Sequence, residues 1–372
     1  MENFNLAVLL VLLGMVGFIL SGIGLIKGNL SFMKIHSRKQ AGLFLTSFFV
    51  LLIIGGVVLP SAEESADSAS SNNQVSAEED QKINKEEGNQ NKTISHNEMQ
   101  VHFIDVGQGE AILIQSPNGS TMLIDAGKRT SGQKVVSYLK KAGVTTLDKL
   151  VSTHPHADHI GGMQDVFANF KVGKVYDSGF PHSSKTYEDF LTTIDKKDIP
   201  FEIAKRGMKI DLDKDLDVEI LHPNNNKKDA NNSSVVIKLT YGSVSFLFTG
   251  DIEGEAEREI LGSNKGKLNS TILKAGHHGS KTSTSTGFLS AVSPETAVIQ
   301  SGAGNSYGHP HDETLSQLKN LGVKVYRNDL QGDIVVTTNG SSHSVNVKPT
   351  HISDATGSPS SGETSMKDQI KV

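Results

Sequence analysis

The chain has 372 residues, a formal net charge of −5, 14 histidines and no cysteine. At roughly 150 residues per domain, this length allows about two domains. Without cysteine the protein has no disulfide framework, cysteine-rich zinc ribbon, iron–sulfur cluster, cysteine nucleophile or lipidated N-terminal cysteine, so any metal site must use histidines and carboxylates.

The charge is distributed unevenly along the chain. Residues 1–60 carry a net charge of +3, residues 61–98 carry −6, and residues 99–372 carry −2. The long C-terminal part is therefore close to neutral, which excludes a polybasic coat for nucleic acids.

Two long apolar segments open the chain, at residues 5–26 and 41–60. A bilayer-spanning helix needs about 20 apolar residues, so each segment is long enough to cross a membrane. All the basic residues of this region lie between the two segments, and basic flanks stay in the cytoplasm. The sequence predicts a transmembrane helical hairpin over residues 1–60, with the rest of the chain outside the cell. The alternative is cleavage after the second segment, which small residues follow as they follow a signal peptide.

Residues 61–98 are rich in Ser, Asn, Glu and Asp and have almost no large apolar side chains. Such a segment cannot bury enough surface to offset the entropy of ordering it, which predicts an acidic, disordered linker. Residues 349–372 have the same polar character and are predicted to be a disordered tail. Residues 99–348 remain as one folded domain.

This domain alternates between strand and helix patterns. In its first half, strands are predicted at residues 100–106, 110–115, 121–125, 147–152 and 172–177, and helices at 133–142, 162–170 and 187–198. In its second half, strands are predicted at residues 201–204, 217–221, 234–239, 245–248, 271–275, 297–300 and 325–326, helices at 253–261, 287–291 and 312–321, and a hairpin at 332–345. A repeated pattern of this kind predicts two packed sheets with helices outside, an α/β sandwich.

The strongest chemical signal is the sequence HPHADH at residues 154–159, where a predicted strand ends. Four of its residues are metal-ligand types: His154, His156, Asp158 and His159. Imidazole and carboxylate groups suit zinc, manganese or iron, and a strand-to-helix junction can aim several of them at one space. The alternative is a polar loop that happens to contain histidines, which this density of ligands disfavours.

Two further motifs follow predicted strands. Asp251 lies in TGD after one apolar strand, and His277 and His278 begin HHGS after another. Either motif alone is weak, because Gly-Asp after a strand is usually a turn and paired histidines are usually incidental. Three strand ends with His or Asp in one domain predict a common site, since functional residues gather on loops at one edge of a sheet.

In this order, HPHADH, TGD and HHGS resemble the metallo-β-lactamase superfamily. More narrowly, DVGQG at residues 105–109, DAG at 125–127, NNSS at 231–234 and NSYGHP at 305–310 are similar to the C-terminal hydrolase domain of ComEC-type competence proteins. The resemblance covers about residues 99–348 and implies an αββα sandwich with a two-metal hydrolase site. Two predicted helices cannot supply the membrane channel of a full ComEC protein.

The resemblance also implies roles for individual residues. It implies two divalent metal ions, zinc or manganese, with six ligands: His154 and His156 for the first metal, Asp158, His159 and His278 for the second, and Asp251 between them. It implies three catalytic residues: Asp158, His277 and Glu253. The superfamily has a further histidine for the first metal shortly before the TGD strand, but this chain has NNSS there. The first metal is therefore expected to be weakly held, completed by water or absent.

Other motif residues are expected around these ligands. Four would orient the ligands without touching the metals: Asp105, Asp125, Asn231 and Asn232. Three in the NSYGHP segment would contact the substrate: Asn305, Tyr307 and His309. The alternative for this segment is a structural loop whose histidine has its hydrogen bonds satisfied.

The resulting hypothesis is a membrane-anchored, extracellular, metal-dependent hydrolase. A phosphodiesterase or nuclease acting on DNA, linked to competence and DNA uptake by the resemblance, suits a site where cations neutralise the charge that develops at phosphorus. A cell-wall phosphocholine or teichoic-acid esterase is the closest alternative, because such enzymes share the three main motifs. A non-catalytic DNA-binding module for uptake is the other, and the near-neutral domain gives it no electrostatic support.

Overall fold

The computed structural model describes residues 97–224 and 229–350. The predicted membrane hairpin, most of the linker and nearly all of the predicted tail lie outside these residues. Within the described part of the chain, no helix has the length and apolar character needed to span a bilayer.

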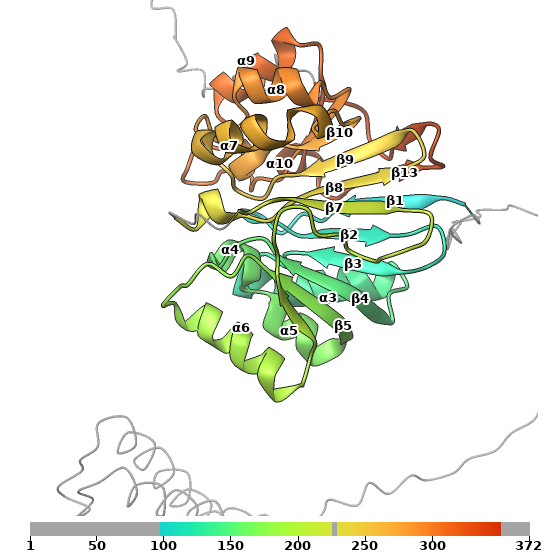
Figure 1. Cartoon of the computed structure of the whole chain (residues 1–372), viewed down its shortest axis with the longest axis vertical. Coiled ribbons are helices and arrows are strands. Elements are labelled where there is room, and N and C mark those ends of the chain that lie inside the picture. Colours follow the sequence, from blue (N-terminus) through green and yellow to red (C-terminus); the bar gives the residue numbers. More distant parts are fainter. Residues whose placement is uncertain (1–96, 225–228, 351–372) are drawn as a thin grey trace, which may run out of the picture. The chain divides into compact units, whose positions relative to one another are not determined.

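Two sheets form the centre of the fold (Figure 1). The first has eight strands, in the spatial order β14(His343–Val345), β13(Ile334–Thr338), β1(Met99–Phe103), β2(Ile112–Gln115), β3(Thr121–Ile124), β4(Thr146–Ser152), β5(Lys171–Asp177) and β6(Phe201–Ile203). Neighbours from β14 to β3 pair antiparallel, whereas β3 to β6 run parallel. The parallel strands therefore direct their carboxyl ends to the same edge of the sheet.

The second sheet has six strands, in the order β12(Lys324–Arg327), β11(Thr296–Ile299), β10(Ile272–Lys274), β9(Val244–Phe248), β8(Val236–Tyr241) and β7(Asp217–His222). Strands β12 to β9 are parallel, and β8 and β7 continue the sheet antiparallel. Both sheets are thus mixed, each with a parallel part that ends in loops on one side.

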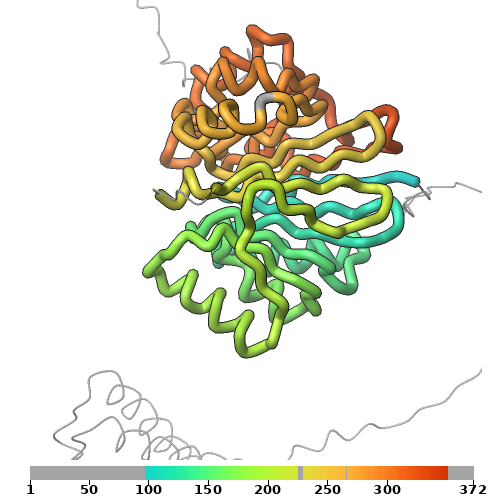
Figure 2. Tube along the Cα trace, in the orientation of Figure 1, coloured from blue at the N-terminus to red at the C-terminus, as the bar shows by residue number. Residues whose placement is uncertain are grey.

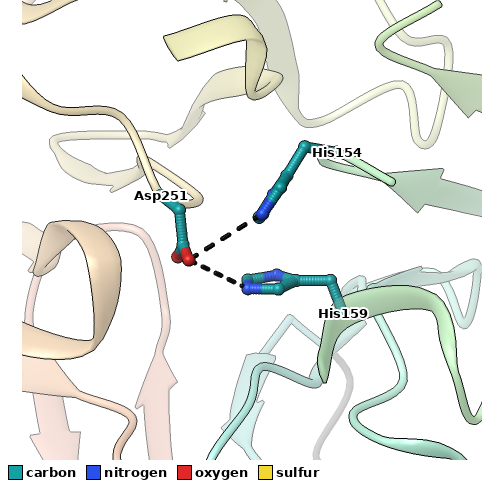
Figure 3. Close-up of side chains that lie close together, drawn as sticks. All are labelled: His154, His159 and Asp251. Atoms are coloured by element: carbon teal, nitrogen blue, oxygen red, sulfur yellow. Dashed lines mark hydrogen bonds and ion pairs between the residues drawn. The ribbon is translucent and has the colours of Figure 1, made fainter. Parts of the chain in front are cut away.

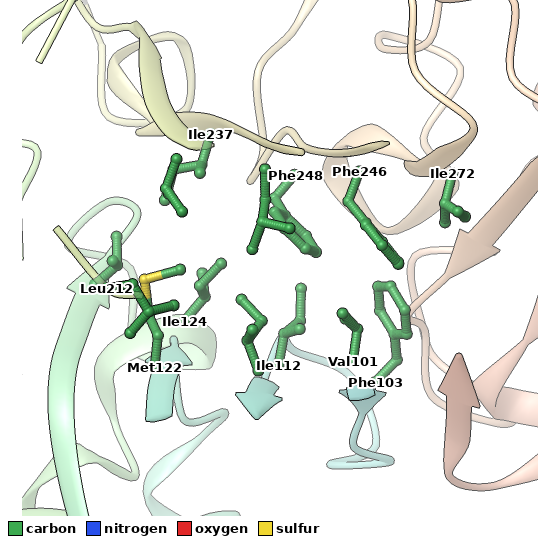
Figure 4. Close-up of a cluster of buried hydrophobic side chains, with 14 of the residues drawn as sticks. Val101, Phe103, Ile112, Met122, Ile124, Leu212, Ile237, Phe246, Phe248 and Ile272 are labelled. Carbon is green, nitrogen blue, oxygen red and sulfur yellow. The ribbon is translucent and has the colours of Figure 1, made fainter. Parts of the chain in front are cut away.

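Apolar side chains fill the space between the two sheets (Figure 4). In β1, Val101 and Phe103 both point into this core, because alternate residues of a strand share a face. Opposite them, β9 contributes Phe246 and Phe248, whose rings stack with centroids 6.0 Å apart. Phe103 and Phe248 meet across the core at 6.3 Å, so the sheets are joined by direct side-chain packing.

Helices cover the outer faces of both sheets and complete the αββα sandwich (Figures 1 and 2). On the first sheet lie α3(Gly132–Lys141), α5(Met163–Asn169) and α6(Lys185–Lys196), and on the second lie α7(Gly254–Asn264), α8(Thr286–Val292) and α9(Asp312–Asn320). Short helices occupy the connections: η2(Arg129–Ser131), α4(Ala157–Ile160), η3(Asn231–Ser233), η4(Lys265–Lys267), η5(Gly276–Gly279) and α10(Asn328–Gln331). In α3 the buried positions Val135, Val136 and Leu139 give the one-sided apolar face of a covering helix.

Chain order proved to be a poor guide to three strands of the second half of the domain, which were expected in the second sheet. Strand β6 pairs with β5, and the C-terminal hairpin of β13 and β14 returns to pair with β1 in the first sheet. Val336 lies opposite Val101 in that pairing, so the returning strand also completes the apolar face of the core. Such pairings depend on contacts between distant segments, which a local pattern does not contain.

Candidate metal centre

The three main motifs meet at one edge of the sandwich. Strand β4 of the first sheet leads into the HPHADH segment, and β9 and β10 of the second sheet lead to Asp251 and to the His277–His278 turn. Backbone hydrogen bonds tie the loops together, from His277 N to the carbonyl oxygen of Gly250 at 3.1 Å and from Val235 N to that of Thr153 at 2.9 Å. The packing of the sheets thus brings together side chains that lie about a hundred residues apart.

Ligand atoms of several residues surround the carboxylate of Asp251 (Figure 3). Its Oδ2 atom lies 3.2 Å from His159 Nε2, 3.8 Å from His154 Nε2 and 3.3 Å from His278 Nε2. Asp158 closes the group, with its Oδ2 atom 3.5 Å from His278 Nε2. These are separations at which two or more donor atoms can share one divalent ion, and the donors are the types that zinc and manganese accept.

Hydrogen bonds on the far side of the rings orient two of the imidazoles. His159 Nδ1 lies 2.6 Å from Asp125 Oδ2, and His278 Nδ1 lies 2.9 Å from the carbonyl oxygen of Gln300. Each ring therefore presents Nε2 to the cluster, and the buried Nε2 of His278 has no hydrogen-bond partner. An imidazole held through one nitrogen with the other left for a ligand is the usual arrangement of a metal-binding histidine.

Asp125 is the buried anchor of this arrangement. It follows β3 in a left-handed conformation with φ of 55°, which is unusual for a residue other than glycine. Its carboxylate accepts hydrogen bonds from Thr153 N at 2.9 Å and from Thr153 Oγ1 at 2.5 Å, in addition to its contact with His159. The structure thus places Asp125 behind the ligands, where the sequence predicted it.

The position expected for the first metal has two imidazoles. His154 Nε2 and His156 Nδ1 are 3.0 Å apart. Ser234 belongs to the NNSS segment, which stands where the superfamily has a third histidine. Its Oγ atom accepts a hydrogen bond from Asp251 N at 3.1 Å. The same atom lies 3.3 Å from His154 Nδ1. His222, the nearest histidine upstream, directs Nε2 to a backbone carbonyl at 2.8 Å. A weakly held first metal stays a prediction.

At the mouth of the cluster, His277 and Glu253 form a pair. His277 Nδ1 lies 3.0 Å from Glu253 Oε1, and His277 Nε2 lies 3.8 Å from Asp251 Oδ2. His277 and His278 have φ values of 46° and 56°, so two consecutive residues other than glycine are left-handed. Strain of this kind persists where the surroundings enforce it, and here it turns the two rings in different directions.

The two asparagines of NNSS hold Glu253 in place. Asn232 Oδ1 accepts hydrogen bonds from Glu253 N at 3.0 Å and from Ala256 N at 3.1 Å, so it caps the first turn of α7. Asn231 Nδ2 lies 3.5 Å from Glu253 Oε1. Asn231 and Asn232 therefore position Glu253 beside His277, whereas the sequence predicted that they orient the metal ligands.

Asp105 lies apart from the ligand cluster. Its half-exposed carboxylate pairs with Lys134 Nζ at 2.9 Å and accepts a hydrogen bond from Gly107 N at 3.0 Å, so it shapes the turn after β1. The same turn approaches the metal-ligand loop at Gly109, where an added Cβ would lie 2.4 Å from the carbonyl oxygen of Asp158. Glycine permits this close approach because it has no Cβ. Its φ of 148° is also one that other residues rarely adopt.

Charges within the cluster shift its pKa values in opposite directions. Burial alone would raise the pKa of Asp251, but the charges of His159 and His278 hold it well below its usual range. Burial would lower the pKa of His278, but the charge of Asp251 and the neighbouring Asp158 carboxylate, 3.5 Å from Nε2, raise it to about 9. Despite the same effect of burial, the charges of Asp251 and Asp125 raise the pKa of His159 well above its usual value. The carboxylates therefore stabilise positive charge on His159 and His278, whereas burial lowers the pKa of His154.

A buried ion pair that the sequence did not single out lies beneath the cluster. Lys274 of β10 and Glu110 in the loop before β2 are fully buried and pair with each other. Lys274 Nζ also donates a hydrogen bond to the carbonyl oxygen of Gly250 at 2.9 Å and lies 3.9 Å from Asp251 Oδ1. The available signal was a lysine at the end of an apolar strand, because lysines are almost never fully buried unless paired.

A pocket of about 330 Å³ opens over the cluster. Asp251 and His278 lie at its base, and Tyr307 and His309 from the predicted substrate segment lie in its wall. Asn305 supports that segment from within, since its Oδ1 atom accepts hydrogen bonds from Tyr307 N at 3.1 Å and from His309 N at 3.0 Å. The structure thus brings two of the three predicted substrate residues to the pocket and gives the third a role in shaping the loop.

An αββα sandwich with histidines and aspartates gathered at one edge defines a class of metal-dependent proteins. The chain belongs to the metallo-β-lactamase superfamily, whose sequence model matches residues 104–302.

Three bacterial proteins are among its curated relatives. The chain is 34% identical to ComE operon protein 3 of Bacillus subtilis (strain 168) over 256 residues, which cover 64% of this chain and 33% of that protein. It is 35% identical over 244 residues to Competence protein ComA of Neisseria gonorrhoeae (65% and 32% covered). It is 32% identical over 251 residues to Recombination protein 2 of Haemophilus influenzae (66% and 29% covered). The chain spans about a third of the length of these relatives, and the resemblance stated from the motifs is confirmed.

Proposed function

We propose that this protein is a metal-dependent phosphodiesterase that cleaves DNA. The observation that carries the proposal is the gathering of Asp158, His159, Asp251 and His278 around one space at the base of an open pocket, with their ligand atoms 3.2–3.5 Å from neighbours. The names of the competence and recombination relatives support DNA as the substrate.

The side chains fit the cations that this superfamily uses. His278 Nε2 is buried without a hydrogen-bond partner, and the low pKa of Asp251 keeps its carboxylate ionised and ready to bind a cation. Divalent ions bound there supply Lewis acidity and lower the pKa of water toward neutrality. Asp158 and Asp251 hold their negative charge at the base of the pocket, where their carboxylates would hold the cations.

Proton transfer to the leaving oxygen falls to His277. Its Nδ1 atom lies 3.0 Å from Glu253 Oε1, and its Nε2 atom lies on the side of Asp251 and the pocket. The contact with Glu253 orients the imidazole, and from this position Nε2 can deliver a proton to the leaving oxygen as the P–O bond breaks. Asn231 and Asn232 keep Glu253 in position for this role.

The proposal is tested with the full chain, Mn²⁺ or Zn²⁺, and single-stranded DNA, double-stranded DNA, bis-(p-nitrophenyl) phosphate and a phosphocholine ester as substrates. We expect DNA hydrolysis to be lost in Asp158→Ala and in His278→Ala. The matched control is His343→Ala, which removes an imidazole from β14, away from the pocket. DNA binding without turnover under every metal, or hydrolysis of the phosphocholine ester alone, would overturn the proposal.

We further propose that the apolar segments at residues 5–26 and 41–60 anchor the protein in the cell membrane with the catalytic domain outside. Support comes from the +3 charge of residues 1–60, whose basic residues lie between the segments. Protease added to intact cells should then degrade the domain, and full protection of the domain would refute this topology.

A further inference from the structure

The rim of the pocket carries the most exposed aromatic ring of the described residues. Tyr307 has 61% of its surface exposed, whereas Asp251 and His278 at the base of the same pocket are 2% and 1% exposed. A substrate that reaches the base must therefore pass beside this ring. A chemical group attached to a phosphate at the base would therefore lie beside the Tyr307 ring.

The loop holds the ring in a fixed orientation. The imidazole of His309 packs against Tyr307 with ring centroids 5.6 Å apart and planes at 23°. His309 is itself nearly buried, and its ring lies 5.5 Å from that of His277. Asn305 binds the backbone of both residues, and the Tyr307 ring packs against His309 while most of its surface stays exposed.

The charges of the pocket limit how it can hold a polyanion. Among its described lining residues there is no lysine or arginine, so ordinary phosphate contacts by basic side chains do not supply the affinity. Two sources of affinity remain, the cation cluster for the phosphate and an exposed aromatic ring for the attached group. A quaternary ammonium group is bound by a cage of several aromatic rings. Apart from histidines, Tyr307 is the one aromatic residue among the described lining residues, so a flat group fits this pocket better than a quaternary ammonium group.

We propose that Tyr307 is a stacking platform for an unpaired nucleobase, and that the substrate of this site is therefore a single-stranded nucleic acid. The inference rests on the proposed phosphodiesterase function and names its substrate class. In a duplex each base is already stacked on its neighbours and paired with its partner. A single strand can splay one base onto Tyr307 while the adjacent phosphate enters the recessed cluster at Asp251 and His278.

The test compares substrates that differ only in their bases. The full chain with Mn²⁺ is given a single-stranded oligothymidylate, an oligomer of equal length with abasic nucleotides, and a blunt duplex. Stacking on an aromatic ring changes binding by roughly five- to 150-fold, so we expect kcat/KM on the oligothymidylate to exceed that on the abasic oligomer by such a factor, mainly through KM. Tyr307→Leu should reduce this ratio to about one, and Tyr307→Phe should restore it because the ring is kept.

The matched control is Phe201→Leu, which removes another exposed aromatic ring from β6, outside the pocket. The ratio should stay at the wild-type value in this variant. The stacking role would be overturned if Tyr307→Leu kept the preference for the oligothymidylate, or if the duplex were cleaved as fast as the single strand. Hydrolysis of the abasic oligomer would in that case still uphold the phosphodiesterase function. No hydrolysis of any of the three substrates would overturn both proposals.

Discussion

Single residues already give the metal centre its electrostatic character. The carboxylates of Asp251, Asp125 and Asp158 raise the pKa values of His159 and His278, so both imidazoles carry protons at neutral pH when no cation is bound. A histidine must be neutral to bind a metal, so metal binding at this centre is coupled to proton release.

We therefore expect metal affinity to rise with pH from about 6 to about 9. The sign follows from the raised pKa of His278, about 9, because its proton competes with the metal below that pH and is already lost above it. Calorimetric titration at pH 7 in two buffers of different ionisation enthalpy measures the protons released per metal. Metal binding without proton release at pH 7 would contradict the prediction.

The contact between Asp125 and His159 makes a second prediction at this scale. Asp125→Asn removes the carboxylate that fixes the ring of His159, and such orienting contacts change metal affinity by about 10- to 100-fold. Competition with a chromogenic chelator measures the weakening. Asp105→Asn is the matched control, since Asp105 pairs with Lys134 outside the cluster and its variant should bind metal within about twofold of wild type. Equal losses in the two variants would place Asp125 outside the centre.

At the scale of elements, the pair of Lys274 and Glu110 joins the two sheets. Lys274 ends β10 of the second sheet, while Glu110 lies in the loop between β1 and β2 of the first. Both side chains are fully buried, so either charge left alone would be strongly unfavourable.

Lys274→Met should lower the free energy of unfolding by about 3–5 kcal/mol, because it leaves the Glu110 carboxylate buried without its partner. The double variant Lys274→Met with Glu110→Leu should recover most of this loss, since no buried charge remains. Urea denaturation of the metal-free protein measures both. If the double variant is as unstable as the single one, the destabilisation arises from packing and not from the unpaired charge.

For the molecule as a whole, near-neutrality has consequences for nucleic-acid binding. Residues 99–372 carry a net charge of only −2, and the pocket has no basic side chain among its described lining residues. Few condensed counterions would be released from a bound strand, since their release requires lysine or arginine at the phosphates.

Binding of a single-stranded phosphorothioate oligonucleotide should accordingly depend weakly on salt. We expect the logarithm of the binding constant to fall with the logarithm of salt concentration with a slope shallower than about −2. Fluorescence anisotropy of a labelled oligonucleotide in the presence of Mn²⁺ measures this slope. A steep dependence would instead show that a basic surface of the domain binds the strand.

The ligand types and the elements that carry them are local properties of the amino-acid sequence. HPHADH has four side chains of metal-ligand type within six residues, and such local density predicts a metal site before any folding is known. Strand and helix periodicities are equally local, which is why the layered architecture was predictable from them.

Tertiary structure alone decided which distant groups meet. It placed Asp105 beside Lys134, Asn232 under Glu253, and the C-terminal hairpin on the first sheet. It also buried Lys274 against Glu110 and placed the exposed Tyr307 at the rim of the pocket. Some of these contacts join segments more than two hundred residues apart. Their geometry follows from how the strands pair and the two sheets pack, and no local pattern of side chains encodes that packing.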